Sequence, residues 1–127
     1  MEFGEDNLRK ARENLKRRKE KQRVGYLALH TRAFRDFESI LKMIVGEYHP
    51  EKVYQWGSLL RPEQFRDYSD IDIALEGVIA PDDYFEMLGK AQAMTRFPVD
   101  IVQLEKIGPE YAEGIRKEGK VVYERAV

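Results

Sequence analysis

The hydrophobic pattern of the chain changes at Pro50, and this change most constrains how the chain can fold. From Asp6 to Tyr48 apolar residues recur at three- and four-residue steps, which is typical of an amphipathic helix. After Pro50 the apolar residues form short runs separated by Gly, Pro and Asp. The sequence therefore predicts an α+β domain in which a small mixed β-sheet is flanked by helices.

The apolar runs after Pro50 predict strands at residues 53–56, 71–75, 99–104 and 121–123. Trp56, at the end of the first run, is interpreted as a core residue. Helices are predicted from Pro81 to Met94 and from Gly108 to Glu118. Each has a proline and an acidic residue at its start, which suits a helix N-terminus.

The first part of the long helix differs in charge from the rest of the chain. Residues 8–23 contain nine Lys or Arg against two Glu, a balance of +7, and the net charge of -1 leaves -8 elsewhere. Leu8, Ala11 and Leu15 form only a short apolar stripe. Because Gly25 is expected to break or bend the helix, we predict a basic helical extension over residues 1–24 and a core domain over 25–127.

The basic extension is either a solvated, highly charged helix end or a segment suited to an acidic partner or to nucleic acid. Few aromatic residues interleave with its cations, so nucleic-acid binding through base stacking is not supported.

The composition excludes several classes of site. The chain has no cysteine, which removes disulfides, cysteine-ligated zinc, iron–sulfur clusters and thiol catalysis. Two histidines do not suffice for a multi-histidine site, so a metal would be held by oxygen ligands. No apolar run exceeds four residues and the acidic N-terminus lacks a signal pattern, so we expect a cytoplasmic protein that does not enter the membrane.

Acidic residues interrupt two of the predicted strands. Side chains alternate along a strand, so Asp70 and Asp72 share one face at about 6–7 Å from each other. Asp100 lies in the third predicted strand, and three carboxylates converge if that strand neighbours the second. Such a cluster needs a cation, and a hard divalent ion such as Mg²⁺ accepts carboxylates together with substrate phosphates.

Gly57-Ser58 follows the first predicted strand and is the candidate phosphate contact. A glycine there lets the backbone approach a phosphate closely, and Ser58 can cap the turn that follows. Arg61 and Arg66 lie in the loop before the acidic strand. They either neutralise triphosphate charge or are solvated loop arginines.

Three segments together carry a resemblance to a known family: Gly57-Ser58, Ser69-Asp70-Ile71-Asp72 and Val99-Asp100-Ile101-Val102. They resemble the polymerase-β-type nucleotidyltransferase superfamily, most closely its minimal nucleotidyltransferase (MNT) branch, over roughly residues 37–124. The chain departs from the family pattern at Leu59 and Pro62, where Gly or Arg is frequent. The basic extension is not part of the minimal core.

The resemblance implies a mixed-sheet core that transfers a nucleoside monophosphate from ATP or another NTP with Mg²⁺, in a two-ion site. Asp70, Asp72 and Asp100 would be the catalytic residues and metal ligands. Gly57 and Ser58 would bind the triphosphate, and we expect Arg61 and Ser69 to complete the nucleotide site.

Many MNT proteins pair with a helical HEPN protein, a toxin ribonuclease, and some add AMP to a tyrosine of that toxin. The resemblance thus implies a protein adenylyltransferase that acts as the antitoxin of a HEPN/MNT-type pair. One alternative is a small-molecule or RNA nucleotidyltransferase completed by oligomerisation, for example as a homodimer. The other is a non-catalytic docking antitoxin.

Overall fold

A single helix of 44 residues, α1 (Glu5–Tyr48), precedes the first strand. The computed structural model describes residues 4–126, so residues 1–3 of the predicted extension and Val127 of the predicted core lie outside the described residues. After α1 come β1 (Lys52–Trp56), β2 (Ile71–Glu76), α2 (Pro81–Ala93), β3 (Val99–Gln103), α3 (Pro109–Glu118) and β4 (Lys120–Glu124). Short 3-10 turns are η1 (Gly57–Leu60), η2 (Pro62–Gln64) and η3 (Leu104–Lys106).

The strands form one four-stranded mixed sheet in the order β3-β2-β1-β4. β1 pairs antiparallel with both β2 and β4, and β2 pairs parallel with β3. The parallel pair is connected through α2, as a crossover between parallel strands requires. The α+β architecture predicted from the sequence is confirmed.

The main core lies between one face of the sheet and the helices α1 and α2. The second half of α1 buries Ala33, Phe37, Ile40 and Ile44, which recur at three- and four-residue steps. They pack with alternate residues of the central strands and with α2, in a cluster that includes Val53, Ile71, Ile73, Leu75, Met87, Ala91 and Ile101.

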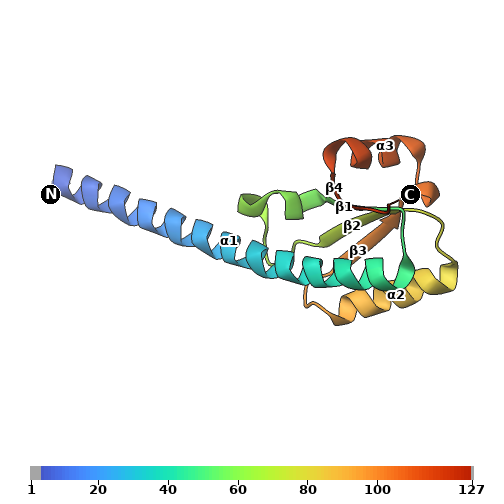
Figure 1. Cartoon of the computed structure of the whole chain (residues 1–127). Helices are drawn as coiled ribbons and strands as arrows, with labels where there is room; N and C mark the ends of the chain where they lie inside the picture. The colour runs from blue at the N-terminus through green and yellow to red at the C-terminus, as the bar shows by residue number, and fades with distance from the viewer. Residues whose placement is uncertain (1–3, 127) are drawn as a thin grey trace.

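Helix α3 covers part of the opposite face of the sheet (Figure 1). Its Ala112 and Ile115 pack against Tyr54, Ala74 and Leu104 in a second, smaller cluster. The rest of this face is not covered by a helix in Figure 1. Asp72 and Asp100 lie on this face, because they alternate along their strands with Ile71, Ile73 and Ile101 of the main core.

Helix α1 passes through Gly25 without interruption, so the predicted break there is wrong. A glycine inside a helix costs only about 1 kcal/mol relative to alanine, and the residues on both sides favour the helix. The division into an extension and a core stays a prediction, since one helix crosses the boundary.

Every residue from Gly4 to Gly25 is exposed, and this segment projects beyond the sheet (Figure 1). None of the described helices is both long and apolar enough to cross a membrane.

Candidate active site

The site begins where β1 ends and the chain turns into η1. Gly57 has φ +74°, in the left-handed region that favours glycine. The carbonyl of the buried Leu59 is bound by two side chains: His30 Nε2 lies 2.6 Å from it, and Gln55 Nε2 donates to it at 3.3 Å. The Gly57-Ser58 turn is therefore held between α1 and β1.

Asp72 lies at the centre of a row of side chains that crosses the sheet. It is paired with Asp100 across the parallel strands β2 and β3, and with Trp56 across the antiparallel strands β1 and β2. Laterally paired residues share a face of a sheet, and neighbouring strands are about 4.8 Å apart. Ile71 and Ile73 point into the core on the other side. The condition under which the three carboxylates converge, that the two acidic strands are neighbours, is therefore met.

Asp70 lies directly before β2 and is exposed, as is Asp100, whereas Asp72 is half-buried. Burial, together with the negative charges of Asp70 and Asp100, raises the pKa of Asp72 to about 7. We call Asp70, Asp72 and Asp100 the acidic row. Because the charges of Asp70 and Asp100 both act on Asp72, the acidic row is unfavourable without a compensating cation.

Gly57 packs directly against the carboxyl of Asp72. A Cβ at position 57 would lie 2.3 Å from Asp72 Oδ2 and 3.0 Å from Cγ. The absence of a side chain at Gly57 is therefore what leaves room for the Asp72 carboxyl beside the turn.

These residues fit a hard divalent cation, because the potential ligands are carboxylate oxygens on one sheet face and their mutual repulsion would be relieved by it. As the side chains lie, no three His, Asp or Glu residues within 4–126 are grouped closely enough to hold a metal ion. Asp70 and Asp100 would have to turn toward Asp72 to share one.

The remaining residues predicted for nucleotide binding differ in their surroundings. Ser58 is half-buried in η1, and Arg61 is exposed at its end. Ser69 closes the turn before β2, because its hydroxyl accepts a hydrogen bond from Arg66 N and its own N–H donates to Arg66 O. The guanidinium of Arg66 lies 3.4 Å from the centroid of the Tyr26 ring, which ties this loop to α1.

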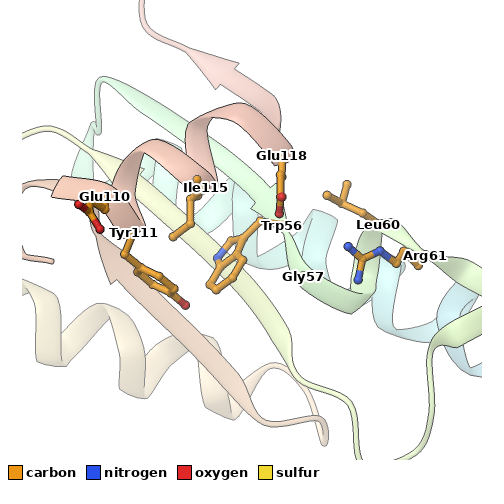
Figure 2. A pocket seen from close by; sticks show the side chains of 9 residues that line it. Trp56, Gly57, Leu60, Arg61, Glu110, Tyr111, Ile115 and Glu118 are labelled. Atoms are coloured by element: carbon orange, nitrogen blue, oxygen red, sulfur yellow. The ribbon is translucent and has the colours of Figure 1, made fainter. Parts of the chain in front are cut away.

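A cavity of about 350 Å³ lies beside Gly57, between η1 and α3 (Figure 2). Trp56, Arg61 and Tyr111 line it. Trp56 is half-buried at the wall of this cavity, so its interpretation as a core residue describes only part of its environment. Tyr111 and the other α3 residues at this cavity were not predicted from the sequence, since nothing local in α3 points to the end of β1.

Comparison with known proteins places this arrangement in a family. Residues 38–126 match the model of the polymerase beta nucleotidyltransferase family. No curated protein sequence matches the chain closely enough to be counted as a relative.

Three solved structures show the same fold. A chain of a toxin–antitoxin complex with AMP-PNP is 23% identical, with a TM-score of 0.58 over 69% of this chain and 73% of that chain. A chain of the toxin–antitoxin complex MntA-HepT is 19% identical, with a TM-score of 0.56 over 71% of each chain. A chain of the tri-AMPylated Shewanella oneidensis HEPN toxin in complex with MNT antitoxin is 21% identical, with a TM-score of 0.57 over 73% of each chain.

The family match covers most of the chain, and it includes the turn at Gly57 and both acidic strands. The resemblance noted in the sequence is therefore confirmed. The chain belongs to the polymerase beta nucleotidyltransferase family.

Proposed function

We propose that this nucleotidyltransferase transfers AMP from ATP to a hydroxyl group of a protein partner, and that the partner is the HEPN-type toxin of a toxin–antitoxin pair. The observation that carries the proposal is the pairing of Asp72 with Asp100 beside Gly57. The choice of nucleotide and partner is supported by structures of similar fold, which contain AMP-PNP or an AMPylated HEPN toxin.

In the proposed reaction the acceptor oxygen forms a bond to the α-phosphorus of ATP. The bond between the α-phosphorus and the bridging oxygen breaks, pyrophosphate leaves, and the hydroxyl proton is released. Gly57 and Ser58 would bind the triphosphate at the turn, and Arg61 would neutralise part of its charge. A glycine at position 57 would also let the backbone approach the phosphates closely.

Asp70, Asp72 and Asp100 would hold the metal. Bound there, Mg²⁺ would neutralise charge on the leaving pyrophosphate and favour the deprotonated acceptor, with two ions as the expected number. Asp72 is fixed by its packing against Gly57, whereas the exposed Asp70 and Asp100 are free to reorient on binding.

The exposure of these acids suits a macromolecular acceptor. Asp70 and Asp100 are both exposed, and neither is among the residues that α3 packs against. A side chain presented on the surface of another protein can therefore approach the row directly.

The test is to incubate the chain with labelled ATP and Mg²⁺, with and without the product of an adjacent HEPN-type gene. Label should appear on the partner, at a tyrosine or another hydroxyl, and mass spectrometry should find added AMP. Label should be lost with EDTA and in the Asp70→Asn and Asp72→Asn variants. Asp67→Asn, an exposed acid in the preceding loop, is the matched control and should retain transfer.

A second measurement tests the metal site without turnover. Mg²⁺ with AMP-PNP should raise the Tm of the wild type and of Asp67→Asn, but not that of the Asp70→Asn/Asp72→Asn double variant. A partner that is bound and silenced without any added mass would instead make this chain a docking antitoxin. Label on RNA or a small molecule, with none on protein, would support the alternative acceptor class.

A further inference from the structure

The cavity between η1 and α3 adjoins the acidic row without being part of it. Gly57 lines the cavity and also packs against Asp72. Trp56 lines it too, and is the residue paired with Asp72 in the sheet. A molecule whose phosphates lie at the Gly57-Ser58 turn could therefore extend its other end into this cavity. Its volume, about 350 Å³, is in the range of small-molecule sites.

The walls of the cavity include two aromatic rings. Trp56 and Tyr111 meet edge to face, with ring centroids 5.9 Å apart and an interplanar angle of 86°. Figure 2 shows the Tyr111 ring reaching from α3 toward the indole. The Tyr111 side chain is also 54% exposed, so much of its ring surface remains free for a flat ligand to stack on.

The polar groups around the rings include both a donor and acceptors. Trp56 Nε1 is buried and has no hydrogen-bond partner among the described residues. Glu110 and Glu118, both exposed on α3, supply carboxylate oxygens at the rim. A ligand with a ring nitrogen that accepts and an amino group that donates would complement this set, once the side chains that bury the indole N–H shift to expose it.

Arg61 stands at the other rim of the cavity, at the end of η1 (Figure 2). Within residues 4–126 it forms no ion pair, so its charge is available to a phosphate. From the end of η1 toward α3, the cavity thus presents first a cationic group, Arg61, and then the aromatic rings of Trp56 and Tyr111. A nucleotide carries its phosphates and its base in the same order.

We infer that this cavity binds the base of the nucleotide substrate, and that it selects a purine with an exocyclic amino group, adenine being the example. The inference rests on the proposed function, because it takes the triphosphate to lie at Gly57-Ser58. Stacking on Tyr111 supplies affinity, and hydrogen bonds from the amino group to Glu110 or Glu118 supply selectivity.

Trp56 is the only tryptophan of the chain, so it reports directly on this cavity. Titration of the full chain with adenosine, without phosphate or Mg²⁺, should change its fluorescence saturably. Inosine has a carbonyl in place of the amino group, and it should bind about tenfold or more weakly than adenosine. Absence of any saturable change with adenosine, in a chain that binds AMP-PNP with Mg²⁺, would overturn the inference.

Variants should be compared by equilibrium dialysis with labelled adenosine, because they alter the surroundings of the indole. Tyr111→Leu should weaken adenosine binding about tenfold, whereas Tyr68→Leu, at an exposed loop tyrosine, should not change it. Glu118→Gln, with Glu110→Gln, should reduce the preference for adenosine over inosine. Unchanged affinity in Tyr111→Leu would place the base elsewhere. Adenosine binding with these properties, but no AMP transfer to any acceptor, would contradict the proposed function and leave the base site intact.

Discussion

Arg116 in α3 donates a hydrogen bond from Nε to Oε1 of Glu76, the last residue of β2, at a distance of 2.7 Å. The same oxygen accepts a hydrogen bond from the Tyr54 hydroxyl of β1 at 2.8 Å. Burial acts to raise the pKa of Glu76, but the hydrogen bonds from Arg116 and Tyr54 outweigh it and hold the pKa below its usual value. One carboxylate therefore joins α3 to two strands of the sheet.

This arrangement predicts a pH-dependent stability. Because folding lowers the pKa of Glu76, its stabilising contribution is complete above the unfolded value of 4.5 and is lost as the pH falls through the folded value. Glu76→Gln should be less stable than the wild type at about pH 7, and the difference should shrink at about pH 3. Urea unfolding at both pH values measures it. Glu38→Gln, at an exposed acid of α1, is the matched control.

Substitution of Gly57 should be costly for two separate reasons. In Gly57→Ala the methyl group would collide with the Asp72 carboxyl, and alanine is disfavoured at φ +74°. The backbone part alone costs about 1–2 kcal/mol. We expect lower stability in chemical denaturation and loss of nucleotide-dependent stabilisation.

Gly89→Ala is the matched control. A Cβ at Gly89, within α2, meets nothing within 4 Å, so this variant should gain about 0.5–1 kcal/mol. Equal effects of the two substitutions would contradict the steric argument. Combining Gly57→Ala with Asp72→Ala should recover the part of the loss that is due to the collision.

The shared carbonyl of Leu59 predicts non-additive effects of its two partners. In His30→Leu or Gln55→Leu the carbonyl keeps one donor, so each single variant should lose about 1 kcal/mol. The double variant leaves a buried acceptor without a partner and should lose more than the sum of the single variants. Denaturant unfolding of all four proteins gives the coupling energy. Strict additivity would show that the two donors act independently of this carbonyl.

The exposed first part of α1 should be dispensable for folding. Its residues make no buried contact, so deletion of residues 1–23 should leave the core folded with a similar Tm. Self-association, or binding to an acidic partner, should weaken and should depend more strongly on salt in the full chain than in the truncated one. Sedimentation and circular dichroism measure these effects. If the core unfolds on truncation, the extension is structural.

The sequence predicted the central sheet and the acidic row because each depends on local pattern. Alternation placed Ile71 and Ile73 in the core, and this alone put Asp70 and Asp72 on the opposite face. For Asp100 the sequence provided only a condition, that its strand neighbours the one after Asp70, and the parallel pairing of β2 with β3 meets that condition.

The features that were missed depend on tertiary contacts or on a balance of small energies. Tyr111 faces Trp56 only because α3 packs across β1, and no periodicity in either segment encodes that contact. Gly25 is a helix breaker by type, yet its cost is small against the continuous hydrogen bonding of a long helix. Ser69 is part of a motif, but its hydroxyl is already bound within the turn before β2.

The continuity of α1 has a consequence for any partner that binds its projecting end. The exposed segment of about twenty residues is roughly 30 Å long, and the same helix packs beneath the sheet through Phe37 and Ile44. No flexible linker lies between the two parts. For a partner bound to the cationic end, the effective concentration at the acidic row is therefore fixed by helix geometry. Lengthening the segment by two residues would rotate that partner by roughly 200° about the helix axis.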